Sequence, residues 1–175
     1  KNLQKKGYKV ILLTSRGPDF RNATERALSN NGLHFVHSAI GPKKGFAGTY
    51  TPYTLKDFKV SGLTKSDMTK MGNSKARPVS FMNGIFMTSG LNKGIMLKTL
   101  LKKTKSNFKG IVFADDHIKH TKRMQEIMGS LSGVDLTTYR YSKIDPVVKA
   151  FHASDKAESI KAWKKLKEVT SEIYK

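Results

Sequence analysis

The chain has 175 residues, of which 38% are hydrophobic and 26% charged, so it has enough apolar material for a packed core and is not expected to be wholly disordered. It contains no cysteine, which excludes disulfides, thiolate nucleophiles and cysteine-based zinc sites, and which fits a reducing compartment. No apolar run approaches the roughly 18 residues that a transmembrane helix needs, and the net charge is +20.

The positive charge is spread along the whole chain. Residues 1–40 carry +5, 41–90 carry +6, 91–149 carry +7 and 150–175 carry +2. Of the 33 basic residues 27 are Lys and 6 are Arg, whereas Arg is the residue preferred for reading base edges and for bidentate phosphate contacts. The composition therefore indicates attraction to anionic partners in general and does not favour specific nucleic-acid recognition.

The first forty residues are predicted to form the end of a helix, a strand, a helix and a second strand. Lys1–Gly7 has the pattern of a last helical turn with its cap. The apolar run Tyr8–Thr14 is typical of a buried parallel strand. Asp19 is expected to cap a helix that ends near Asn30, and Leu33–Ala39 is predicted as the second strand of a βαβ unit.

The middle of the chain has a different character. Residues 41–78 are rich in Gly, Pro, Thr, Ser and Lys and keep no helical or strand period, so we predict an insertion of loops and short elements. The apolar stretch Val79–Ser89 follows. It contains Asn83-Gly84, which is either a two-residue hairpin turn or a glycine within one strand.

The second half alternates helices and strands. A helix is predicted from Asn92 to about Lys105, and Gly110–Ala114 is predicted as a buried strand. A helix, a strand at Val134–Tyr141 and a helical region that starts at Asp145 follow. The residues of this last region that are expected to reach the core are Val147, Val148, Phe151, Ile160, Trp163, Leu166, Val169 and Ile173.

Polar residues follow two of the predicted strands and open one helix. The segment 14–16 follows the first strand, Lys93 stands at a helix start, and Asp115 and Asp116 directly follow another strand. Ligands of open parallel sheets bind beyond the carboxyl ends of the strands. Adjacent carboxylates are also costly unless a cation compensates their charge. The aspartate pair is therefore a candidate metal site, although a capping hydroxyl and a solvated lysine would explain the other two positions equally simply.

The order of these segments resembles motifs two, three and four of the haloacid dehalogenase superfamily. The matching stretches are Val10–Arg16, Leu91–Leu97 and Ile111–Asp116. The resemblance covers about residues 7–141, with 41–90 as the variable part. Members of the superfamily are mostly Mg²⁺-dependent phosphohydrolases.

The resemblance implies an α/β fold, with a Rossmann-like core in which helices cover both faces of a parallel sheet. Residues 1–40 and 79–175 would form this core. Residues 41–78 would be a cap-like insertion between motifs two and three that selects the substrate. A flexible surface loop is the alternative for this insertion.

The resemblance also implies roles for the polar residues. Thr14 would donate its hydroxyl to a phosphoryl oxygen of the substrate, with Ser15 beside it. Lys93 would neutralise the phosphoryl group and hold the attacking carboxylate. Asp116 would bind Mg²⁺ directly. Asp115 would either bind the ion directly or hydrogen-bond to its ligands.

Two further features near these motifs have open alternatives. Arg16 would either contact the substrate phosphate or pair with a neighbouring side chain. His117 and His120 follow the aspartates at helical i, i+3 spacing. We interpret these histidines as capping and solvated helix positions and not as ligands of a transition metal.

One motif of the superfamily is absent. Its Asp-x-Asp motif, which follows the central strand of the sheet and supplies the nucleophile and the general acid/base, occurs nowhere in these 175 residues. Without that strand, the strands ending at Thr14 and Asp115 would have unpaired buried edges, at a cost of about 1–3 kcal/mol for each polar group. We therefore expect an upstream segment of the same protein to complete the sheet.

The resemblance thus implies a Mg²⁺-dependent phosphatase that hydrolyses phosphoric monoesters through an aspartyl-phosphate intermediate. Its substrate would be a phosphorylated, anionic small molecule or phosphoprotein. The alternative is a non-catalytic basic module that binds nucleic acid or acidic lipid through diffuse Lys charge. A nucleic-acid end phosphatase would combine the two.

Overall fold

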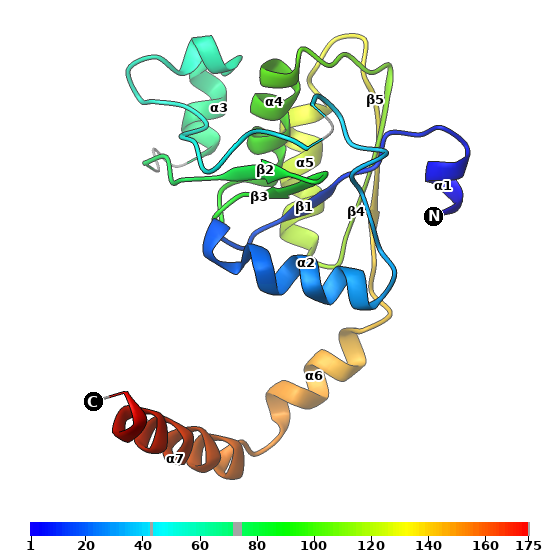
Figure 1. The fold of residues 1–175 in the computed structure, drawn as a ribbon. Helices are drawn as coiled ribbons and strands as arrows, with labels where there is room; N and C mark the ends of the chain where they lie inside the picture. Colours follow the sequence, from blue (N-terminus) through cyan, green and yellow to red (C-terminus); the bar gives the residue numbers. More distant parts are fainter. Residues whose placement is uncertain (43, 72–74, 175) are drawn as a thin grey trace. The chain divides into compact units, whose positions relative to one another are not determined.

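The computed structural model describes residues 1–42, 44–71 and 75–174, which divide into two compact units. The first unit, Lys1–Arg140, contains strands and helices, and the second, from Tyr141 onwards, contains helices (Figure 1). The protein is therefore of the mixed α/β class, as the sequence predicts.

The strands of the first unit form two small sheets. In one, β1 (Leu12–Thr14) pairs in parallel with β3 (Ile85–Met87), which pairs antiparallel with β2 (Ser80–Met82). In the other, β4 (Gly110–Asp115) pairs in parallel with β5 (Asp135–Arg140). Among the described residues no strand joins the two sheets, so a single continuous sheet is not formed.

A tight hairpin connects β2 and β3. Its turn residues Asn83 and Gly84 have φ angles of 53° and 74°, the pair of positive values that a type I′ turn requires. The first of the two sequence interpretations, a hairpin turn, is therefore confirmed. Through this hairpin, β3 becomes the parallel neighbour of β1, with Thr14 opposite Met87.

The predicted strand at Leu33–Ala39 is wrong, and with it the predicted βαβ unit. The segment forms turns, in which Ser38 N–H donates to the carbonyl oxygen of Phe35 at 3.1 Å. It meets the chain before β1 where Val10 N–H donates to Ser38 O at 2.9 Å. From Leu12 on, the β2–β3 hairpin forms the hydrogen bonds on this edge of β1, since Leu12 N–H donates to the carbonyl oxygen of Gly84. No room is left there for a second strand.

The helices of the first unit lie close to their predicted positions. Asn92, where the fourth helix was predicted to start, caps it, since its Oδ1 accepts from the N–H groups of Gly94 and Ile95. Asp19 does not cap the second helix, because it lies in a 3₁₀ turn and Phe20 takes the capping position. The helical segments are α1 (Asn2–Lys5), η1 (Pro18–Phe20), α2 (Arg21–Asn30), η2 (Phe58–Ser61), α3 (Lys65–Lys70), α4 (Lys93–Thr104) and α5 (Ile118–Met128).

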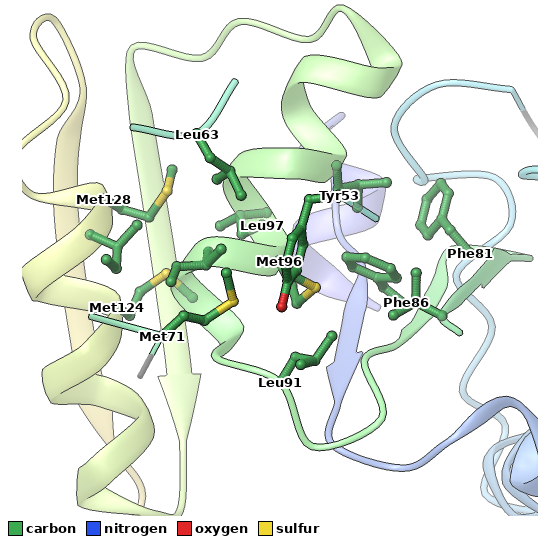
Figure 2. Close-up of a cluster of buried hydrophobic side chains, with 14 of the residues drawn as sticks. Tyr53, Leu63, Met71, Phe81, Phe86, Leu91, Met96, Leu97, Met124 and Met128 are labelled. Atoms are coloured by element: carbon green, nitrogen blue, oxygen red, sulfur yellow. The ribbon is translucent and has the colours of Figure 1, made fainter. Parts of the chain in front are cut away.

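The core of the first unit is built around α4. Figure 2 shows Met96 and Leu97 of α4 between Met124 and Met128 on one side and two phenylalanines of the β2–β3 hairpin on the other. Gly94 permits the close approach of α4 to α5, since a Cβ atom there would lie 2.9 Å from the carbonyl oxygen of Arg123. The start of α4, where the site residue Lys93 lies, is thus held against α5.

The segment between the two halves of this unit packs against the core. Isolated bridges join Gly45 to Met82 and Tyr50 to Val79, and the segment contributes η2 and α3. Tyr53 is buried in the same core cluster. The described part of residues 41–78 is therefore anchored, although its role in selecting a substrate stays a prediction.

The second unit contains α6 (Asp145–Ala153) and α7 (Ala157–Ile173). Neither helix buries a residue within this unit. The expectation that eight apolar residues of this region, from Val147 to Ile173, reach the core stays a prediction, because the two units are described separately. No helix in the described part of the chain is long and apolar enough to span a membrane.

Candidate functional site

A buried ion pair joins the start of α4 to the end of β4. Nζ of Lys93, the first residue of α4, lies 2.6 Å from Oδ2 of Asp115, the last residue of β4. The side chains are 9% and 5% exposed. At this depth the two charges are poorly solvated, so each depends on the other for compensation.

The second carboxylate oxygen of Asp115 is also engaged. Its Oδ1 accepts from the N–H of His117 at 2.9 Å. His117 in turn caps α5, because its Nδ1 accepts from the N–H of Lys119 at 3.2 Å. The capping interpretation of His117 is therefore confirmed, and the carboxylate of Asp115 is fixed from both sides.

Asp116 differs from its neighbour. Its side chain is exposed, and it has no ion pair or hydrogen bond with any residue that the structure describes. The same residues contain no group of three or more His, Asp or Glu side chains that could hold a metal ion by themselves. Of the two predicted metal ligands, Asp116 is thus the one whose oxygens are free.

His120 is not the solvated residue that the sequence suggested. It is half-buried, and its Nδ1 is buried without a hydrogen-bond partner in the described structure. Burial lowers the pKa of His120 below its usual 6.5, and the positive charge of Lys93 acts in the same direction. Its surroundings therefore favour the neutral form of the His120 imidazole, and the charges of both Lys93 and Asp115 act on it.

Thr14 ends β1 and is bonded to the residue that follows β3. Its carbonyl oxygen accepts from both the N–H and the hydroxyl of Thr88, each at 2.9 Å. Its own Oγ1 accepts from the N–H of Arg16 at 3.3 Å, which leaves the Thr14 hydroxyl hydrogen available. Thr88 is completely buried, and it was not singled out from the sequence, although it follows an apolar strand as Thr14 does.

The other residues of the first segment make local contacts. Arg16 donates from Nη1 to the hydroxyl of Thr24 at 3.0 Å, which is the local pairing that the sequence left open. The carbonyl oxygen of Arg16 accepts from Ser89 N–H at 3.1 Å. The hydroxyl oxygen of Ser15 is buried without a partner among the described residues.

The predicted segments therefore meet at the carboxyl ends of three strands. The loop after β1 is bonded to Thr88 and Ser89 after β3, and the latter loop leads within a few residues to Lys93. Lys93 then contacts Asp115 at the end of β4. The direct contact is between Lys93 and Asp115, whereas Thr14 is connected to Lys93 through residues 88–92.

Two strands that end at these residues have an open edge. β1 pairs with β3 alone and β4 pairs with β5 alone in the described chain. On β1, Leu12 N–H and Thr14 C=O bond toward the hairpin, so the polar groups of Leu13 between them point to the opposite edge. Unpaired strand edges of this kind bind further strands.

Comparison with known proteins identifies a single family. The family model described as "Protein of unknown function (DUF2608)" matches residues 1–173. No curated protein matches the chain significantly, and no solved structure does so.

Proposed function

The chain belongs to the DUF2608 family, and we propose that it forms part of a Mg²⁺-dependent phosphatase that resembles the haloacid dehalogenase superfamily. The observation on which this rests is the buried pair of Lys93 and Asp115 at the carboxyl end of β4. A lysine held there by a carboxylate is positioned in advance to neutralise a phosphoryl group, with no reorganisation when charge develops.

Thr14 and Asp116 would complete the contacts to the substrate and its cation. The free hydroxyl hydrogen of Thr14 would be donated to a phosphoryl oxygen. Mg²⁺ is commonly held by one or two carboxylates together with substrate phosphate oxygens and water. The exposed carboxylate of Asp116, with Asp115 behind it, fits that requirement. When bound, Mg²⁺ would offset the negative charge on the phosphoryl group.

The nucleophile would come from a strand that lies between β1 and β4. Both strands have an unpaired edge in the described chain, and both end in a proposed site residue. A strand from another segment of the same protein would pair with them, bring an aspartate to the same end and complete a Rossmann-like core. The described part of residues 41–78 would form its cap-like insertion.

The reaction would proceed in two displacements. A carboxylate oxygen of the nucleophilic aspartate forms a bond to phosphorus while the bond from phosphorus to the ester oxygen breaks, and the departing alcohol takes a proton from a general acid. Water then attacks the acyl phosphate, releases inorganic phosphate and restores the aspartate. Lys93 and Thr14 stabilise the charge on the phosphoryl oxygens in both steps.

The test is hydrolysis of a generic aryl phosphate by the complete protein with Mg²⁺. We expect Asp116→Ala to lower kcat by about 100-fold or more, because a metal-binding carboxylate is lost. Asp135→Ala, which removes another exposed carboxylate at the start of β5, should leave turnover unchanged. Unchanged turnover of the Asp116→Ala variant, or of the wild type in excess EDTA, would count decisively against the proposal.

A second candidate function follows from the charge. Three ion pairs between described residues involve Arg21, Lys93 and Lys98, while the net charge is +20. A non-catalytic module that binds polyanions such as nucleic acid or acidic lipid would show an affinity that falls steeply as salt rises. Phosphatase activity without polyanion affinity, measured at two salt concentrations, would eliminate this candidate.

A further inference from the structure

A small cavity lies beside the start of α4. Its volume is about 190 Å³, below the roughly 300–1,000 Å³ that is usual for the site of a drug-sized ligand. The cavity suits one small group better than a whole cofactor. It is lined by Lys70, Met71, Arg77, Gly90, Leu91, Asn92, Lys119 and Arg123.

The lining of this cavity is strongly basic. Four of its side chains, those of Lys70, Arg77, Lys119 and Arg123, are positively charged, and none of the described residues that line it is acidic. None of the four forms an ion pair with a residue in the described part of the chain. Like charges gathered around so small a space repel one another unless an anion neutralises them.

Two of these cations are held in place by main-chain carbonyl groups. Arg77 donates from Nη1 to the carbonyl oxygen of Ser89 at 2.9 Å, and Lys70 donates from Nζ to that of Glu126 at 3.0 Å. A guanidinium has five N–H donors and an ammonium three, so each keeps donors for a ligand. The cations come from three separate parts of the chain, namely α3, the loop before β2 and α5.

One residue of the cavity lining carries an amide with an unused donor. Asn92 is 5% exposed, and its Oδ1 accepts from the first N–H groups of α4. Its Nδ2 is buried and has no hydrogen-bond partner among the described residues. A buried donor without a partner costs about 1–3 kcal/mol, so native structures rarely keep one without a reason. The positive end of the α4 dipole at this position also favours an anion.

We propose that this cavity is a phosphate-binding site, separate from the Lys93–Asp115 pair. The inference stands on the cavity and does not rest on the proposed phosphatase function. A phosphate dianion matches the several cations better than a carboxylate does, because it brings more charge and more acceptor oxygens. The guanidinium groups of Arg77 and Arg123 can bind such oxygens in the bidentate manner. The ligand is either free phosphate or a small molecule that presents a phosphate group.

The test is calorimetric titration of the full-length protein with inorganic phosphate at constant ionic strength. We expect saturable binding in the roughly millimolar range or tighter. Arg123→Gln and Arg77→Gln should each weaken it about tenfold or more, since each removes a charge-assisted contact. Lys122→Gln is the matched control, because Lys122 is exposed, lies next to Arg123 and does not line the cavity. Circular dichroism establishes that each variant is folded. If Arg123→Gln does not fold, Lys119→Gln replaces it as the cavity variant, because Lys119 is exposed and lines the cavity.

Three outcomes would overturn the proposal. They are the absence of saturable binding, equal weakening by Lys122→Gln and by the cavity variants, and loss of binding in Lys93→Gln but not in the cavity variants. The last result would assign the anion to the Lys93–Asp115 pair. Titration with phenyl phosphate distinguishes free phosphate from a phosphate group on a larger ligand. If phenyl phosphate binds as tightly as inorganic phosphate, the ligand is a larger molecule that carries a phosphate group. If only inorganic phosphate binds, the ligand is the free ion. Turnover of the Asp116→Ala variant tests the phosphatase proposal independently.

Discussion

Lys98 and Asp67 form an ion pair that fastens α3 to α4. Nζ of Lys98 lies 2.7 Å from Oδ2 of Asp67, and the side chains are 14% and 6% exposed. The same oxygen accepts from the N–H and the hydroxyl of Thr64, while Asp67 N–H donates to the Thr64 hydroxyl oxygen. One carboxylate thus completes the capping box of α3 and holds α3 against α4.

This arrangement predicts a specific dependence of stability on pH. Burial alone would raise the pKa of Asp67, but the hydrogen bonds from Lys98 and Thr64 outweigh burial and hold it below the usual 3.8. Because the folded-state pKa is below the unfolded-state value, the stabilisation is complete above about pH 4 and is lost as the pH falls through the folded-state pKa. Asp67→Asn should therefore be less stable than wild type at neutral pH and lose less stability on acidification. Urea denaturation between neutral and acidic pH measures both effects.

The control for this prediction is Asp57→Asn. Asp57 is exposed and lies in the same segment, so its replacement should leave both the neutral stability and the acid dependence nearly as in wild type. A loss of stability on acidification in Asp67→Asn as steep as in wild type would show that Asp67 does not contribute in the predicted way.

The Lys93–Asp115 pair predicts a large asymmetry between single and double variants. Lys93→Met leaves the buried carboxylate of Asp115 without its cation, which should lower the free energy of unfolding by about 3–5 kcal/mol. Adding Asp115→Asn removes the uncompensated charge and should restore part of the loss. Lys109→Met, at an exposed position, should change the free energy of unfolding by less than about 0.5 kcal/mol. Similar unfolding free energies for Lys93→Met and Lys109→Met would contradict the buried pair.

His120 predicts a second pH effect, in a different range. Its folded-state pKa lies below 6.5, chiefly because of burial. Between that pKa and 6.5 the unfolded chain binds more protons than the folded chain, so stability falls as the pH drops through this window. His120→Gln should lose less stability there than wild type, whereas His152→Gln, at an exposed position, should behave as wild type does. Urea denaturation at closely spaced pH values measures how the free energy of unfolding changes with pH. The same change in His120→Gln and His152→Gln would refute the prediction.

Elements with a strong local signal were predictable from the sequence. α4 begins at Lys93, one residue after the predicted start at Asn92. β4 runs into Asp115 as predicted, and the Asn83-Gly84 turn is one of the two alternatives considered. In each case neighbouring residues carry the information: a capping side chain, an unbroken apolar run, or two residues that accept positive φ angles.

Elements that depend on a distant partner were not predictable. Leu33–Ala39 has the pattern of a strand, but β3, some fifty residues further along the chain, takes the edge of β1. The same reason applies to the site. The sequence predicts that Lys93 and the aspartates converge, but it does not indicate that Asp115 is the one that pairs with Lys93. The cavity formed with α3 and α5 was missed for the same reason, since its cations are far apart in the chain.

The bridge between Gly45 and Met82 allows a direct test of how the described part of residues 41–78 packs against the β2–β3 hairpin. Gly45 has a φ of 84°, and a Cβ atom there would overlap the carbonyl oxygen of Phe81, which accepts from the N–H of Phe46 at 2.8 Å. Gly48 has a φ of 65° with nothing within 4 Å of the same atom.

Gly48→Ala should therefore cost only the strain of a left-handed alanine, about 1–2 kcal/mol. Gly45→Ala adds to the same strain the displacement of the Phe81 main chain, and it should cost about 1–3 kcal/mol more. Urea denaturation of both variants measures the difference. Equal costs would mean that Gly45 does not lie against the β2–β3 hairpin in solution.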